Sequence, residues 1–335
     1  MIWANNLRFF AVFAVIILHV SATFVSGIEQ GSDLYGGYDW WVGNVFDSSV
    51  RWCVPVFVMI SGYFLLSKSE SSRVFFDKRA SKILVPLIFW IALFSLWIIF
   101  KGAMKGDVSS SMALLLNNFK IGEPYYHLWY LIMILFLYTI TPALRLVIEK
   151  INKSEMQFLL AFLFIMSAIN VAHDKLFFNG ADSDEIFINK FLLFIPYYVL
   201  GGYIKRFDIH MSTCFSFILF ISSVTITIVG AYYYTDKYFY NYLSVNTIIA
   251  SISIFFIIKN CADFDIKSEH FANLSFGIYL IHPIFIELVS QALRVKVYSL
   301  FGSVGYIAIT SVLVFALSYL SVLVMSKSKV LKKCI

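Results

Sequence analysis

Two polar residues, Arg8 and His19, lie eleven positions apart in an otherwise apolar N-terminal segment. At about 100° per residue, this spacing brings both back to nearly the same face of a helix, roughly 16 Å apart along its axis. That length is similar to an extended pantetheine arm, so Arg8 could hold a nucleotide phosphate while a thioester lies beside His19. An imidazole with an ordinary pKa of about 6.5 is a natural general base for an attacking hydroxyl, and an acylated imidazole is the other chemical possibility.

Each of these residues also has an ordinary structural explanation. Arg8 is typical of a snorkelling cation at a helix end, and His19 could pack between helices while hydrogen-bonded to a neighbour. For Arg8 alone the structural explanation is favoured. The ring of His19, however, has a donor and an acceptor to satisfy in a region without water, which favours a catalytic role.

A second apolar segment begins with Arg51 and continues to Ser61, Gly62 and Tyr63. An ionisable group within a membrane span costs roughly 2.5 to 3.5 kcal/mol, so Arg51 needs a reason to be there. We expect Arg51 toward the outer end of its helix, where it either snorkels or contacts substrate. Ser61 and Gly62 allow close approach of another helix or of a ligand.

Histidines recur in two later apolar segments. His127 and Trp129 open one of them, either as an interfacial aromatic belt or as part of a site. Tyr279 and His282 are three residues apart and share a helix face. His282 either completes the site or satisfies a carbonyl freed by the kink at Pro283.

A basic run, Lys78, Arg79 and Lys82, enters another apolar segment. Such a run is often only a topology signal, but its cations could also bind the phosphates of a nucleotide cofactor. The four cysteines show no CxxC or Cys/His spacing typical of zinc, so no metal is expected.

The composition indicates which elements position these residues. The chain is 60% hydrophobic and 14% charged, with a mean hydropathy of +0.81, so most of it must lie in lipid. We predict an all-α polytopic membrane protein forming a single domain over residues 1–335, with no separate soluble domain. Applying the length of about 20 residues that a helix needs to cross a bilayer predicts about ten transmembrane helices, near 8–26, 45–66, 82–100, 128–148, 156–172, 187–204, 211–233, 242–258, 271–292 and 303–325.

The distribution of Lys and Arg predicts the orientation. With the N-terminus in the cytoplasm, the cytoplasmic segments carry about twice as many Lys and Arg as the opposite side, and the Lys-rich C-terminus also falls inside. The net charge of +6 then follows from topology and anionic lipid, without a nucleic-acid partner. The first apolar run lacks a small-x-small cleavage site, so we expect it to be retained rather than cleaved as a signal peptide.

Taken together, these motifs resemble those of the membrane acyltransferase-3 family, in family order and over nearly the whole chain. Within the family, the likeness is to bacterial O-acetyltransferases that modify surface glycans such as enterobacterial common antigen or O-antigen. The resemblance rests on these pieces: Asn6-Leu7-Arg8 with ten residues before His19, Arg51 to Ser61-Gly62-Tyr63, Lys78-Arg79-x-x-Lys82-Ile83-x-x-Pro86, His127-Leu128-Trp129, and Tyr279-Leu280-Ile281-His282-Pro283.

The resemblance implies a ten-helix domain in the bacterial inner membrane that transfers an acyl group, with acetyl preferred, from cytoplasmic acyl-CoA to a sugar hydroxyl of a lipid-linked or periplasmic glycan. It further implies that His19 is catalytic, that Arg8 binds the donor, and that the basic run at 78–82 belongs to the donor side. One departure is Asn5, where relatives often carry Asp; if that Asp orients a site residue, Asn5 weakens the orientation.

Two other classes of function compete with acyl transfer. A proton-coupled transporter or flippase for a lipid-linked sugar could use His19 and His282 as a proton relay. A non-catalytic scaffold for glycan assembly explains the loops but not the buried polar residues.

Overall fold

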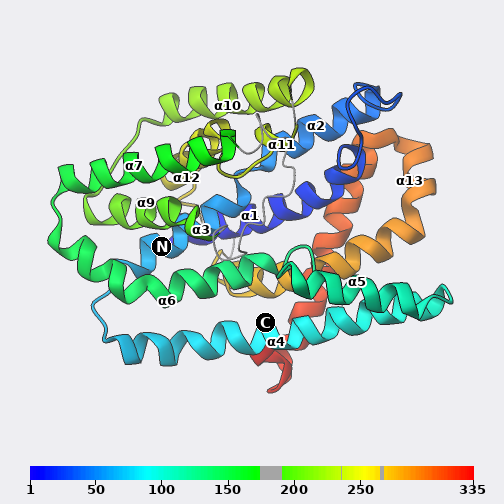
Figure 1. Cartoon of the computed structure of the whole chain (residues 1–335), viewed down its shortest axis with the longest axis horizontal. Coiled ribbons are helices and arrows are strands. Elements are labelled where there is room, and N and C mark those ends of the chain that lie inside the picture. The colour runs from blue at the N-terminus through cyan, green and yellow to red at the C-terminus, as the bar shows by residue number, and fades with distance from the viewer. Residues whose placement is uncertain (174–190, 235, 265–267) are drawn as a thin grey trace.

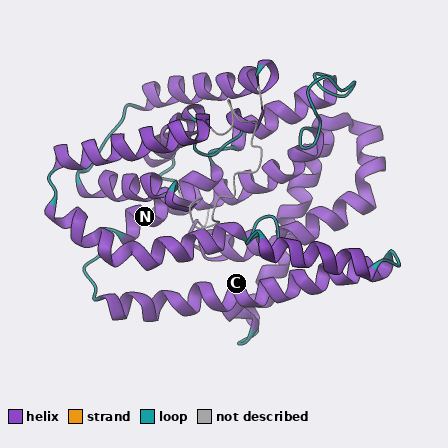
Figure 2. Cartoon of the chain, in the orientation of Figure 1, coloured by secondary structure: helices purple, strands orange, loops and turns teal. Residues whose placement is uncertain are grey.

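The computed structural model describes residues 1–173, 191–234, 236–264 and 268–335. All regular elements in these ranges are helices (Figure 2). In chain order they are α1 (Ile2–Ser21), η1 (Ala22–Phe24), α2 (Tyr38–Val50), α3 (Cys53–Leu65), α4 (Ser72–Met104), α5 (Val108–Lys120), α6 (Trp129–Lys150), α7 (Lys153–Ala172), α9 (Ile195–Arg206), α10 (Thr213–Tyr233), α11 (Asp236–Phe239), α12 (Val245–Cys261), α13 (Ser268–Lys327) and η3 (Leu331–Cys334).

Helices α4, α6, α7 and α10 run roughly along the longest axis of the molecule, whereas α13 bends and runs across that direction (Figure 1). Within the described residues, seven helical segments are long and apolar enough to cross a membrane. The predicted all-α, multi-pass class is therefore confirmed, and the chain is a multi-pass membrane protein by its helices.

The count and limits of the predicted spans need correction. The predicted spans at 271–292 and 303–325 are two helices that meet at a kink at Gly302 (φ 62°, ψ −168°) within α13, so their separation agrees with the prediction although α13 counts as one of the seven segments. The 242–258 span is α12, a shorter apolar helix than the seven. The 187–204 span begins outside the described residues, and its described part contains α9. Hydropathy finds lipid-compatible runs but does not detect where the backbone breaks inside one.

The predicted span at 45–66 shows such a break. Its helix ends at Val50 and restarts at Cys53, so Arg51 and Trp52 fall between α2 and α3. A backbone break at this depth is tolerated only when surrounding protein satisfies the freed polar groups. Trp52 contributes by donating from its indole nitrogen to the carbonyl of Ser49 (2.8 Å).

α1 lies at the centre of the packing and contacts α2, α3, α12 and α13 (Figure 1). Its start is fixed by Asn6, whose amide donates to the carbonyls of Ala262 and Phe264, each at 2.8 Å. Arg8 and His19 are therefore carried by a helix that is held on several sides.

Two glycines allow α3 and α9 to pack backbone against backbone. A Cβ on Gly62 would lie 1.8 Å from the carbonyl oxygen of Tyr198, and one on Gly201 would lie 1.9 Å from that of Met59. Small residues at membrane helix crossings serve this purpose. Of the two roles predicted for Gly62, close approach of a helix is the one the structure shows.

Two ends of the molecule are distinguished below. The N-terminal end carries the start of α1 and the meeting point of the last turns of α3, α6 and α9, shown by hydrogen bonds from Arg145 to Leu65 O and from Arg206 to Glu149 O. The opposite end carries η1, the start of α2 and the bend of α13, where Phe24 contacts Tyr298. Both names are used in this sense below.

Candidate active site

Three histidines from distant parts of the sequence form one cluster. The ring centroids of His19 and His282 are 5.3 Å apart and nearly parallel, and those of His127 and His282 are 5.5 Å apart. His19 comes from α1, His127 from the turn before α6, and His282 from α13. We call these three residues the histidine cluster.

Backbone carbonyls fix which nitrogen of two of these rings carries hydrogen. His127 Nε2 lies 3.2 Å from the carbonyl oxygen of Leu280, and His282 Nδ1 lies within hydrogen-bond distance of that of Tyr279. Because a carbonyl can only accept, each of these nitrogens must donate. The opposite nitrogens, His127 Nδ1 and His282 Nε2, are buried and have no hydrogen-bond partner among the described residues.

His19 has a different environment from the other two. Its side chain is partly exposed, and no hydrogen bond joins its ring to another described residue. Its neighbours are the rings of His282 and Tyr126, the latter at 4.9 Å. The structural alternative of a histidine hydrogen-bonded between helices therefore does not describe His19, whose nitrogens are available to a ligand.

Arg51 is not at the outer end of its helix as expected. It lies in the middle of the segment Tyr38–Leu65, at the α2–α3 break, where its guanidinium pairs with Asp47 and donates to Tyr240 O (3.0 Å). The predicted position was wrong because the helix that begins after Arg51 is preceded by another helix, α2, which extends from the break toward the opposite end.

A cavity of about 230 Å³ connects Arg8 to the neighbourhood of the histidines. Its walls include Arg8, Ser61, Tyr130, Tyr138 and Tyr279. We call it the α1 cavity. Tyr279 closes one end of it: its ring lies 5.4 Å from that of His127 and 5.8 Å from that of His282, and its hydroxyl donates to the backbone carbonyl of His127.

The guanidinium of Arg8 is held but not neutralised. It donates to Asn5 Oδ1 (3.2 Å) and lies 5.2 Å from the centre of the Phe64 ring. It forms no ion pair with a carboxylate among the described residues. The residue that the sequence singled out as a departure, Asn5, is thus the one that orients Arg8.

A carboxylate lies beside the cluster that the sequence did not assign to the site. Glu287 accepts from Trp97 Nε1 (2.8 Å), from the hydroxyl of Tyr125 and from Lys101 Nζ (2.8 Å). Tyr125 packs against Tyr126, which in turn contacts His19. A Glu inside an apolar helix was a visible signal, but its partners come from α4 and the turn before α6, which the sequence does not pair.

A second cavity, of about 400 Å³, lies toward the opposite end. It begins at Thr23, one turn beyond His19, and is also lined by Phe24, Asp39, Arg294 and Tyr298. We call it the outer cavity. Its walls combine aromatic rings with a carboxylate and a guanidinium.

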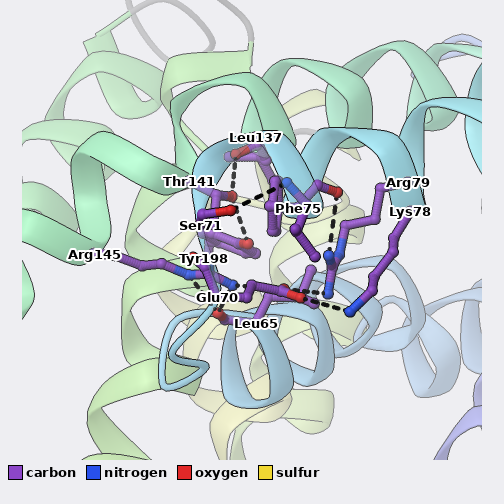
Figure 3. A network of polar contacts seen from close by, with 11 residues as sticks. Leu65, Glu70, Ser71, Phe75, Lys78, Arg79, Leu137, Thr141, Arg145 and Tyr198 are labelled. Carbon is purple, nitrogen blue, oxygen red and sulfur yellow. Dashed lines mark hydrogen bonds and ion pairs between the residues drawn. The ribbon is translucent and has the colours of Figure 1, made fainter.

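The predicted basic run lies at the N-terminal end in a different network (Figure 3). The carboxylate of Glu70 lies between Arg145 on one side and Lys78 and Arg79 on the other, at N–O distances of 3.3, 3.4 and 2.8 Å respectively. Burial raises the pKa of Glu70, but hydrogen bonds from Arg145 and Arg79 outweigh this and hold the pKa below its ordinary value. Lys82 is exposed and makes no hydrogen bond or ion pair with the described residues.

The remaining predicted residues divide between the site and the packing. Ser61 lines the α1 cavity, while its hydroxyl donates to Phe57 O (2.9 Å). Tyr63 is buried against Trp3, with ring centroids 5.2 Å apart. Trp129 packs on Phe194 rather than on the histidine cluster. In the part of the chain that the structure describes, no three His, Cys, Asp or Glu side chains are arranged to hold a metal ion.

Comparison with known families identifies the family of the chain. The model of the acyltransferase 3 family, described as an acyltransferase domain, matches residues 1–323. The chain therefore belongs to this family of membrane acyltransferases. Searches of curated proteins and of solved structures returned no match.

Proposed function

We propose that this protein is an O-acyltransferase that moves an acyl group, with acetyl preferred by resemblance, from cytoplasmic acyl-CoA to a sugar hydroxyl of a surface polysaccharide or its lipid-linked precursor. The observation that carries the proposal is the placement of His19 between two cavities. The α1 cavity runs from Arg8 to Tyr279, whose ring contacts His127 and His282, and Thr23, four residues after His19, lines the outer cavity.

The donor is proposed to enter from the N-terminal end, which the Lys and Arg distribution places in the cytoplasm of a bacterial inner membrane. Arg8 binds a phosphate of acyl-CoA, because its guanidinium has no carboxylate partner within the described ranges. The pantetheine arm then follows the α1 cavity, with the thioester near His19. Lys78, Arg79 and Lys82 add positive potential on this side.

The acceptor approaches from the outer cavity, where aromatic rings suit the faces of a sugar and Asp39 can accept from its hydroxyls. His19 removes the proton as the hydroxyl oxygen attacks the thioester carbon. A C–O bond forms, the C–S bond breaks, and the proton passes to the CoA thiolate, so atoms and charge balance. His19 acts as general base in this step.

The groups around His19 have separate parts in this proposal. The guanidinium of Arg51, which is paired with Asp47, is proposed to stabilise negative charge on the thioester oxygen. The bare nitrogens of His127 and His282 accept hydrogen bonds from the sugar hydroxyl or from protonated His19. Tyr279 positions His127 through its hydrogen bond to the backbone.

The test is replacement of His19 by Ala in purified protein supplied with acetyl-CoA and a glycan acceptor. We expect release of free CoA and the acetyl mass increment on the glycan to disappear, while membrane insertion and thermal stability persist. Normal acylation by this variant would contradict the proposal. A wild-type protein that moves a lipid-linked sugar without consuming acetyl-CoA would instead support the transporter or flippase.

A further inference from the structure

A third cavity, of about 340 Å³, opens at the N-terminal end, and the roles described so far do not use it. It lies where the last turns of α3, α6 and α9 meet, and its walls include Ser67, Lys68, Arg145, Glu149, Lys205 and Arg206. We call it the basic cavity. Its volume falls within the roughly 300–1,000 Å³ that is usual for small-ligand sites.

Positive charge exceeds negative charge on these walls. Four cations, Lys68, Arg145, Lys205 and Arg206, face one carboxylate, Glu149. Glu70 reduces the surplus only in part, because it is shared among Arg145, Arg79 and Lys78 (Figure 3). A concave surface with such an excess concentrates anions.

Capping of helix ends explains two of the four cations. Arg145 donates to Leu65 O (2.9 Å) and Arg206 to Glu149 O (3.1 Å), which are carbonyls that helix ends leave unpaired. The other two are not used in this way. The ammonium of Lys68 has no hydrogen bond or ion pair with the described residues. That of Lys205 lies 5.4 Å from the centre of the Tyr63 ring and interacts electrostatically with the exposed carboxylate of Asp208, without forming an ion pair among the described residues.

The basic cavity is also linked to the α1 cavity. The Phe75 ring packs against the guanidinium of Arg145 (4.6 Å) and against the ring of Tyr138 (6.0 Å). Arg145 lines the basic cavity and Tyr138 lines the α1 cavity. A ligand in the basic cavity therefore lies a short chain of contacts away from the proposed donor path.

We infer that the basic cavity is a phosphate-binding site, with Lys68 and Lys205 as the cations that contact the phosphate and the Ser67 hydroxyl available to donate. Two ligands present a phosphate at a cytoplasmic membrane surface: the nucleotide part of acyl-CoA and the headgroup of an anionic phospholipid. The nucleotide assignment rests on the proposed function, whereas the lipid assignment does not.

The experiment compares the double variant Lys68→Gln/Lys205→Gln with Lys150→Gln/Lys153→Gln, which removes the same charge from exposed positions outside the cavity. In neutral detergent, binding of adenosine 3′,5′-bisphosphate is measured by calorimetry. Weakening by about tenfold in the cavity variant, with no change in the control, supports a nucleotide site. A Lys68→Arg/Lys205→Arg variant should retain binding, which excludes misfolding as the cause.

The lipid arm uses nanodiscs of phosphatidylglycerol or phosphatidylcholine and measures thermal stability. If phosphatidylglycerol stabilises the wild type and the control but not the Gln cavity variant, while nucleotide binding is unchanged, the phosphate belongs to a lipid. If the two Gln variants show the same nucleotide affinity and the same stabilisation by phosphatidylglycerol, the proposed phosphate-binding site is wrong. Failure of the wild type to consume acetyl-CoA would overturn the proposed function but not the lipid arm.

Discussion

The Glu70 network and the histidine cluster are both polar groups held inside a membrane protein, but they are satisfied to different degrees. Each oxygen of Glu70 has a cationic partner, and the guanidiniums of Arg79 and Arg145 also pack on Phe75. In the histidine cluster, two buried nitrogens have no hydrogen-bond partner in the part of the chain that the structure describes. Because unpaired buried polar atoms are costly, a fully paired network is expected to hold the fold, and an unpaired one to await a ligand.

The sharpest test of this contrast removes only the bare nitrogens. In His282→Asn the side-chain amide can still donate to Tyr279 O, as Nδ1 does, and in His127→Gln it can still donate to Leu280 O, as Nε2 does. We expect kcat to fall by about 10²-fold or more in each, the range of lost acid–base assistance, with little change in melting temperature. Loss of folding with normal specific activity would reverse the assignment and make the cluster structural.

The converse change targets Glu70. Glu70→Gln leaves Arg79 and Arg145 without their anion, and removing one partner of this partly buried network is expected to destabilise by about 1 to 3 kcal/mol. We expect a lower melting temperature with little loss of specific activity in the folded fraction. A melting temperature equal to that of the wild type would show that the network does not hold the fold.

The same carboxylate predicts a dependence on pH. The pKa of Glu70 is lowered in the folded state. The contribution of the ionised carboxylate to the free energy of unfolding is therefore complete above the ordinary Glu pKa of about 4.3, and it is lost as pH falls through the lower folded value. The difference in melting temperature between wild type and Glu70→Gln should therefore narrow below about pH 4. A difference that is constant down to pH 3 would exclude this origin.

The smallest effect is expected at Asn5. Its contact with Arg8 is intermediate between the paired Glu70 network and the unpaired histidine nitrogens, because it is a hydrogen bond from a cation to a neutral acceptor. Asn5→Asp makes that bond charge-assisted and fixes the guanidinium more firmly. We expect the KM for acyl-CoA to fall by about threefold with kcat unchanged. An increase in KM would mean that the new carboxylate competes with the donor phosphate for Arg8.

The sequence predicted some of the site because certain signals are local. Arg8 and His19 share one helix, so their spacing follows from helical geometry. His127, Tyr279 and His282 were selected as polar residues in apolar surroundings, and the structure brings all three together with His19. The sequence also singled out three residues that pack between helices instead: Trp129, Gly62 and Tyr63. Aromatic residues and glycines are as common in helix packing as in active sites, so their presence alone does not distinguish the two.

By itself, the sequence determined the membrane class, the helical content and the alignment of Arg8 with His19, because burial in lipid and helical periodicity act over neighbouring residues. Only the tertiary structure decided that Arg51 lies at a helix break, that Glu287 and Tyr126 lie beside the cluster, and which ring nitrogens are bare. Most of these features depend on groups more than a hundred residues away, such as the carbonyl of Leu280 for His127 and the ring of Tyr126 for His19. Spacing along the chain does not encode contacts of that kind.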